Sequence, residues 1–297
     1  MPVIEVKNLR KRYGDTVAVR DVSFAVERGE IFGILGPNGA GKTTTVECMA
    51  GLRAPDAGTI TVLDRPPRDP SLRRDVGVQL QESQLPDKIT VREALELYSG
   101  FYPAPADWRA LAGTLGLAGD LRSRYAKLSG GRKQRLSIAL ALIGNPRIAI
   151  LDELTTGLDP QARRDTWDLI ESIRDTGVTI VLVTHFMEEA SRLCDRLAVI
   201  DRGEVVALDT PAGLVTAISA EQRIRFRPSV PVDDALLLAA PGVTAVRRHG
   251  EQLEVAGTGN LLHAVTSVLA AHQIIANDLR IEQASLDEAF VRLVGRD

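Results

Sequence analysis

A glycine-rich segment near the N-terminus has the residue types that bind the phosphates of a nucleotide. Residues 36–44 read GPNGAGKTT and fit the pattern G-x-x-x-x-G-K-[ST]. Glycines let the backbone bend around a phosphate with its N–H groups pointing inward, and the dipole of a following helix favours the anion. The Lys42 ammonium would bridge the β- and γ-phosphates, and the Thr43 hydroxyl would complete the shell of a Mg²⁺ ion. The segment therefore predicts a nucleoside triphosphate site.

Two carboxylates and one histidine follow apolar runs further along the chain. Asp152 and Glu153 end the run that begins at Arg147, and His185 follows the run Thr179–Thr184. At the end of a buried strand, Asp152 could hold Mg²⁺ through water, and Glu153 could orient or deprotonate an attacking water. From the residues alone, an acid pair is also typical of a solvated turn, and a single histidine is more often structural than a phosphate contact.

The apolar patterns around these residues predict the elements that position them. The run Ile31–Leu35 predicts a buried strand before the glycine-rich segment, and residues 45–50 have helical spacing after it. Alternation predicts strands at Val3–Val6 and Val22–Val26, and it places Tyr13 in the loop after the first of them. Taken alone, Tyr13 is typical of an edge aromatic that covers core. A strand, a phosphate loop and a helix in this order predict an α/β fold.

Further strands and helices alternate up to about residue 217. Thr90 and Glu93 form a capping-box pattern at the start of a helix, and Gly144-Asn145-Pro146 ends a longer helix that opens after Leu128. Other elements are expected at residues 59–63, 76–81, 107–115, 147–153, 159–174 and 179–184, and a hairpin is expected at residues 196–201 and 204–208.

The tail from about residue 220 carries no nucleotide-binding motif. Its patterns predict strands at residues 223–227, 243–248, 252–255 and 274–281, and helices at residues 232–240, 261–271 and 286–293. The order βαββαβ predicts a small ferredoxin-like fold followed by a last helix. We expect a stabilising or dimerising appendage here rather than a ligand-sensing domain, on fold analogy alone.

Composition bounds the class of protein. The 297 residues are 44% hydrophobic and 25% charged, which is ordinary for a globular chain, and the net charge of −3 gives no support for a nucleic-acid binder. No apolar run approaches the roughly 20 residues of a membrane span, and the charged N-terminus lacks the apolar centre of a signal peptide. We therefore expect a cytosolic protein that reaches a membrane only through a partner. Cys48 and Cys194 are expected to be buried rather than disulfide-bonded.

Taken together, these motifs resemble the nucleotide-binding subunit of an ABC transporter over roughly residues 3–217. The segment Leu128-Ser129-Gly130-Gly131 is similar to the ABC signature, which is specific to this family among phosphate-loop proteins. The resemblance assigns catalytic roles to Glu153, His185 and Gln81, and metal ligation to Thr43, Gln81 and Asp152. It assigns nucleotide contacts to Tyr13 (stacking on adenine), Gly36, Asn38, Gly39, Ala40, Gly41, Lys42, Thr43, Thr44, Ser129, Gly130, Gly131 and Asp159.

The resemblance also implies an architecture and a set of partners. It implies a phosphate-loop ABC ATPase domain at residues 1–218, with a helical signature subdomain at about 82–145, and an accessory domain at residues 219–297. ATP and Mg²⁺ would lie between two ATPase subunits, identical or different, on the cytoplasmic face of the membrane. The helical segment would contact a transmembrane permease subunit. The stretch around Asp209-Thr210-Pro211 is most similar to the drug- and antibiotic-export branch, which implies export of a drug, an antibiotic or a lipid.

Two departures and two alternatives accompany this interpretation. The signature's usual fifth residue, Gln, is Arg132, and the usual Pro after the catalytic glutamate is Leu154. We expect the first to alter fine coupling and the second to loosen the loop that follows. One alternative is an ABC-type regulatory ATPase that acts on ribosomes or DNA without a membrane partner. The other makes the tail a binding module that controls the ATPase.

Overall fold

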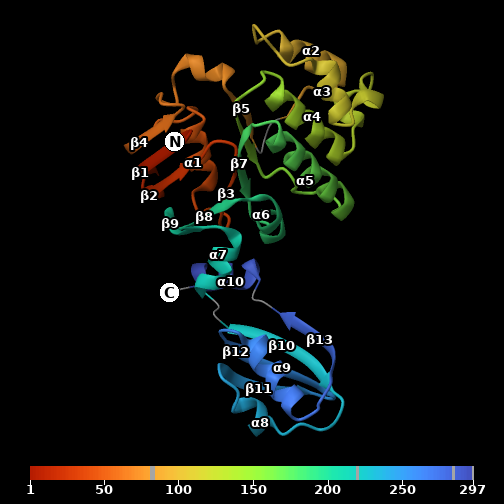
Figure 1. The fold of residues 1–297 in the computed structure, drawn as a ribbon. Helices are drawn as coiled ribbons and strands as arrows, with labels where there is room; N and C mark the ends of the chain where they lie inside the picture. The colour runs from red at the N-terminus through yellow and green to blue at the C-terminus, as the bar shows by residue number, and fades with distance from the viewer. Residues whose placement is uncertain (81–83, 219–220, 283–284, 296–297) are drawn as a thin grey trace. The chain divides into compact units, whose positions relative to one another are not determined.

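The computed structural model describes residues 1–80, 84–218, 221–282 and 285–295 (Figure 1). The contacts within the chain divide it into two compact units, Met1–Pro211 and Ala212–Asp297. The boundary predicted from the sequence lies after residue 218. Each unit is described by itself.

The first unit is built on a nine-stranded sheet in the order β4-β1-β2-β9-β8-β3-β7-β6-β5. Strands β3, β7, β6, β5 and β8 run parallel to one another. β6 and β7 are buried at every position, as their continuous apolar runs predict. The strands are β1 (Ile4–Tyr13), β2 (Thr16–Val26), β3 (Ile31–Leu35), β4 (Ala57–Val62), β5 (Val76–Gln79), β6 (Ile148–Asp152), β7 (Thr179–Thr184), β8 (Arg196–Asp201) and β9 (Glu204–Asp209).

The sheet has an antiparallel part, formed by β1, β2 and β4, that joins the rest along β2 and β9. The register between β2 and β9 is a single pair within the described residues, Asp21 with Glu204. The backbone N–H groups of Arg20 and Asp21 both donate to the carbonyl oxygen of Gly203, at 2.8 and 3.1 Å. The antiparallel part is therefore attached to the parallel part by few backbone hydrogen bonds.

Helices cover the sheet, and α2, α3 and α4 gather beside β5, away from β4 and β1 (Figure 1). Side-chain caps start four of these helices: Thr90 with Glu93 as a capping box on α2, Asp107 on α3, Ser129 on α4 and Asp159 on α5. None of the helices in the described ranges combines the length and the apolarity needed to cross a bilayer. The helices are α1 (Lys42–Met49), α2 (Val91–Ser99), α3 (Trp108–Thr114), α4 (Gly130–Leu142), α5 (Pro160–Asp175) and α6 (Met187–Leu193).

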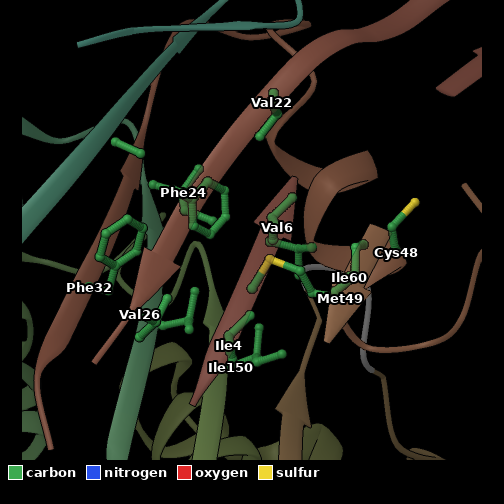
Figure 2. Close-up of a cluster of buried hydrophobic side chains, with 14 of the residues drawn as sticks. Ile4, Val6, Val22, Phe24, Val26, Phe32, Cys48, Met49, Ile60 and Ile150 are labelled. Atoms are coloured by element: carbon green, nitrogen blue, oxygen red, sulfur yellow. The ribbon is translucent and has the colours of Figure 1, made fainter. Parts of the chain in front are cut away.

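One core cluster joins the antiparallel and parallel parts of the sheet. Figure 2 shows Val6, Ile60 and Met49 gathered where β1, β4 and α1 meet. The rings of Phe24 and Phe32 stack with their centroids 5.1 Å apart. Burial of such side chains stabilises the unit by about 1.5–3 kcal/mol each. Cys48 and Cys194 are buried and free, as the sequence predicted.

The second unit has a four-stranded antiparallel sheet in the order β11-β12-β10-β13. Its core is formed by one face of the sheet together with α8 and α9, and it includes Ile224, Phe226, Leu253 and Val265. The elements follow the predicted order βαββαβ, and their bounds are β10 (Glu221–Pro228), α8 (Asp234–Leu238), β11 (Val243–His249), β12 (Gln252–Thr258), α9 (Leu261–Ala271) and β13 (Ala276–Glu282). Two helices flank them in sequence, α7 (Pro211–Ile218) and α10 (Leu286–Val294).

One prediction about local structure was wrong, and one helix was not predicted. Tyr13 is the last residue of β1 and does not lie in a loop, because β1 runs past Val6 and pairs with β2 up to Tyr13–Thr16. Bulges at Asn8 and beyond interrupt the alternation that a sequence pattern relies on. Helix α6 was not predicted, since its seven residues are too few for a clear helical period.

Candidate functional site

Three parallel strands place the predicted chemistry at one edge of the sheet. β3 leads into the glycine-rich segment, β6 ends at Asp152 with Glu153 after it, and β7 ends just before His185. β7 lies between β3 and β6, so these three strand ends are neighbours. This is the edge at which open parallel sheets bind ligands.

The glycine-rich segment has the backbone that its sequence requires. Gly41 precedes α1 with φ 101°, in the left-handed region that favours glycine. A Cβ at this position would lie 2.4 Å from the carbonyl oxygen of Ala18. The segment can therefore approach β2 closely only with glycine here, and it lies at the start of α1, where backbone N–H groups favour an anion.

Lys42 is buried in the floor of this segment, with 5% of the residue exposed. Its Nζ donates to the carbonyl oxygens of Gly36 and Pro37 at 2.9 and 3.0 Å. Burial lowers the pKa of Lys42, and the nearby charges of Glu153 and Asp152 oppose that shift. A buried ammonium held by carbonyl oxygens can exchange them for phosphate oxygens, which bind it more strongly.

Asp152 presents a buried carboxylate beside Lys42. The residue is 1% exposed, and both of its carboxylate oxygens lack a hydrogen-bond partner among the described residues. Burial, and then the charge of Glu153, raises the pKa of Asp152 to about 6. Buried oxygens without partners are costly unless a cation binds them. With the hydroxyl of Thr43 on the first turn of α1, this carboxylate forms the hard-oxygen donor set that suits Mg²⁺.

Glu153 and His185 face each other across the ends of β6 and β7. Glu153 Oε1 lies 3.3 Å from His185 Nδ1. Glu153 has φ 50°, which is unusual for a residue with a side chain, and its N–H donates to the carbonyl oxygen of Val183 at 2.9 Å. The carboxylate is thus directed toward the histidine and away from the core.

These groups line one cavity of about 700 Å³. Tyr13 lies at this cavity with 41% of the residue exposed, and the charged ends of Lys11 and Arg53 lie 5.6 and 5.4 Å from its ring. An exposed ring beside a phosphate-binding loop is available for stacking on a base. The cavity is lined by Tyr13, Ala18, Asn38, Gly39, Gly41, Lys42, Thr43, Thr44, Glu153, Thr156 and His185.

Other predicted site residues do not line this cavity. Gly36, Ala40 and Asp152 do not line the cavity. Ser129, Gly130 and Gly131 begin α4, with Ser129 as its cap, and Asp159 caps α5 by accepting from the N–H groups at positions 161 and 162. None of these four lines the cavity of this chain either. Gln81 lies outside the described residues.

Three residues at this site were not predicted from the sequence. Gln79 is buried, and its Oε1 accepts from the N–H of Asp152 at 3.1 Å, which fixes the end of β6. Ala18 and Thr156 line the cavity. The place of Gln79 at the end of a predicted strand was the available signal, whereas only the folded structure brings Ala18 to the loop.

Known proteins share both the sequence and the fold. A sequence model of the ABC transporter family matches residues 19–156. The "Nod factor export ATP-binding protein I" of Ralstonia nicotianae (strain ATCC BAA-1114 / GMI1000) is 38% identical, over 100% of this chain and 95% of that protein. The protein of the same name in Burkholderia orbicola (strain AU 1054) is 39% identical, over 99% of this chain and 97% of that protein.

Solved structures of ABC transporter subunits have a fold similar to that of this chain. One described as the ATP binding subunit of an ABC transporter has a TM-score of 0.65 and 30% identity, covering 72% of this chain and 92% of its own. Another, cbiO1 from Clostridium perfringens, is described as part of an ABC transporter complex. It has a TM-score of 0.65 and 27% identity, and the match covers 72% of this chain and 90% of cbiO1.

Proposed function

This chain belongs to the ATP-binding proteins of ABC transporters, and from that membership we propose the roles of its residues, its metal and its partners. It binds ATP and is an ATPase that serves transport. The observation that carries the proposal is the cavity in which Tyr13, the phosphate loop, Glu153 and His185 meet. Stacking, phosphate binding and water activation are thereby available around one nucleotide.

The chemistry is in-line attack of water on the γ-phosphate. Tyr13 stacks on the adenine, and the backbone N–H groups of Gly39, Gly41 and Thr43 bind the phosphates together with Lys42. Glu153 orients the water and accepts its proton, since its carboxylate already faces the cavity. His185, 3.3 Å from Glu153, contacts the γ-phosphate and keeps that carboxylate in place.

Thr43 and Asp152 would hold Mg²⁺, and Gln81 completes the proposed set. When bound, the ion neutralises charge on the β- and γ-phosphates. The two carboxylate oxygens of Asp152, which have no hydrogen-bond partner within the described ranges, support this assignment. Gln79 keeps Asp152 in position, because the Gln79 side-chain oxygen accepts a hydrogen bond from the backbone N–H of Asp152.

Two ATPase subunits form the working unit, identical or different. Ser129, Gly130 and Gly131 begin a helix, where N–H groups favour an anion, yet they do not line the cavity of their own chain. We assign them to the nucleotide held by the other subunit. Asp159 caps α5, in the segment that would lie between the two subunits.

Transport runs through a separate transmembrane permease, which places this subunit on the cytoplasmic face of the membrane. The full-length relatives named for Nod factor export support export as the direction. Nod factor is accordingly the first substrate to test, followed by drugs, antibiotics and lipids. An integral membrane protein should co-purify with the chain from detergent extracts. Recovery with ribosomes or DNA instead would favour the regulatory alternative.

The variant Glu153→Gln tests the catalytic assignment. It should bind ATP, hydrolyse it at least about 100-fold more slowly, and accumulate as an ATP-bound dimer, because binding and chemistry use different residues. Phosphate release and gel filtration with ATP and Mg²⁺ measure both effects. Hydrolysis at the wild-type rate would remove Glu153 from the mechanism.

The second unit is proposed to be a ferredoxin-like accessory domain. The element order βαββαβ and the strand order β11-β12-β10-β13 support this assignment. A core of its own, around Ile224 and Phe226, supports independent folding. We assign it a stabilising or dimerising role, and a ligand screen on the isolated domain tests the sensing alternative.

A further inference from the structure

A buried carboxylate on α6 binds the segment that follows Glu153. Glu189 is 0% exposed, and its Oε1 accepts from Thr155 Oγ1 at 2.8 Å and from Trp167 Nε1 at 2.9 Å. Its Oε2 is buried without a hydrogen-bond partner among the described residues. Burying a carboxylate without a cation is costly, and an apolar side chain would pack there at less cost. A role beyond stability is therefore expected.

The chain positions of these residues indicate what that role is. Thr155 follows Glu153 by two residues, and Glu189 follows His185 by four. One carboxylate oxygen thus ties the loop that carries Glu153 to the helix that begins after His185. Trp167 lies on α5, which starts directly after the same loop, so its bond to Glu189 connects α5 to the same carboxylate oxygen. The three segments meet at a single acceptor, which we term the Glu189 clamp: Glu189, Thr155 and Trp167.

Glu153 needs such a clamp because its backbone is strained. A residue with a side chain at φ 50° persists only where its surroundings hold it there. Before Glu153 the backbone is anchored in β6, and its own N–H bonds to Val183. After Glu153, the backbone hydrogen bond from the Thr156 N–H to the Glu153 carbonyl oxygen is long, at 3.4 Å. The short hydrogen bond from Thr155 Oγ1 to Glu189 therefore holds this side of the loop.

A second contact holds the His185 side of the pair. The centroids of the His185 and Phe186 rings lie 4.1 Å apart, and the guanidinium carbon of Arg163 lies 4.5 Å from the centroid of the Phe186 ring. Arg163 is on α5, one turn before Trp167. α5 therefore contacts the segment around His185 at two successive turns, once through Phe186 and once through Glu189.

We propose that Glu189 is a positioning residue for ATP hydrolysis, which holds the strained loop so that the Glu153 carboxylate stays beside His185. This rests on the proposed catalytic role of Glu153. Without the clamp the loop relaxes, and the carboxylate leaves the place from which it orients the water. Phosphate binding is unaffected, because no member of the clamp lines the nucleotide cavity.

Thr155→Val in the full chain, with the permease present if the isolated subunit is slow, is the central test. It removes the hydroxyl and keeps the shape. We expect kcat to fall at least about tenfold while the Kd for ATP stays within about twofold, since a shift of about 1 Å at a catalytic group has effects of this size or larger. Thr155→Ser restores the hydroxyl and should recover kcat. Glu189→Ala should behave like Thr155→Val, and the double variant should be no slower than either single one.

Ile170→Val is the matched control, because Ile170 is buried on α5 but is not one of the three clamp residues. It should lower stability and leave kcat unchanged. Hydrogen–deuterium exchange across residues 153–158 should speed up in Thr155→Val and not in Ile170→Val, and this readout needs no hydrolysis. Wild-type kcat and exchange in Thr155→Val, or additive losses in the double variant, would overturn the proposal. Full activity in Glu153→Gln would instead overturn the catalytic assignment beneath it.

Discussion

Replacing Asp152 by Asn should stabilise the nucleotide-free protein, and the gain should depend on pH. Asp152 is buried with no hydrogen-bond partner for either carboxylate oxygen in the described part of the chain, and its pKa is raised from 3.8 to about 6. The folded state therefore binds this proton more tightly than the unfolded chain does. The contribution to the unfolding free energy is fully present below pH 3.8 and is lost as the pH rises through about 6.

The size of the effect follows from the pKa difference. A rise of about two units corresponds to about 3 kcal/mol lost once the carboxyl is ionised. The Asn side chain does not ionise, so the unfolding free energy of Asp152→Asn does not fall in this way as the pH rises. The variant and the wild type should have similar stability near pH 4, and the variant should be more stable by about 3 kcal/mol near pH 8.

Urea unfolding between pH 4 and pH 8, without nucleotide or divalent cations, measures this difference. Both tryptophans, Trp108 and Trp167, belong to the first unit, so their fluorescence reports on that unit. Asp15→Asn is the matched control, because Asp15 is an exposed turn residue, and it should show no such pH dependence. The same Asp152→Asn variant should lose Mg²⁺-dependent hydrolysis. A difference that does not change with pH, or a variant less stable than wild type at pH 8, would refute the reasoning.

Three further predictions test the rest of the site and the domain plan. Mixing Lys42→Ala with Ser129→Arg, each inactive alone, should restore at most about a quarter of wild-type sites, because half the dimers are mixed and each has one intact site. No recovery of phosphate release is expected if the signature serves its own chain. Ending the chain at Ser219 should leave a folded, ATP-binding domain with weaker dimerisation or export, and an insoluble product would place the boundary elsewhere. Tyr13→Ala should weaken ATP binding about tenfold through lost stacking and leave kcat nearly unchanged, as fluorescent-nucleotide titration can show.

Local patterns predicted most elements of the first unit. β3, β7 and the hairpin of β8 and β9 have regular apolar runs with clear ends, and the structure has them close to the predicted bounds. The capping box at Thr90 and Glu93 is present with both of its hydrogen bonds. These features depend on residues within a few positions of one another, which a sequence shows directly.

What the sequence could not show depends on contacts between distant segments. Gln79 bonds to Asp152, and Glu189 bonds to Thr155 and Trp167, each across more than twenty residues. A buried glutamate on a short helix looks like any exposed one, because α6 carries two adjacent glutamates and only the second is buried. The left-handed backbone at Glu153 also has no signal in residue types, since glutamate rarely adopts it.

The narrow attachment between β2 and β9 bears on which nucleotides the protein accepts. Tyr13 belongs to the antiparallel part of the sheet, whose register with β9 is the single pair Asp21–Glu204 among the described residues, whereas the phosphate loop follows β3 in the parallel part. The base and the triphosphate are thus bound by different parts of the sheet, which one core cluster joins. An aromatic face stacks on any flat base and reads none of its hydrogen-bonding edges. Guanosine and adenosine triphosphates should therefore occupy the site with similar affinity and be hydrolysed at a similar rate.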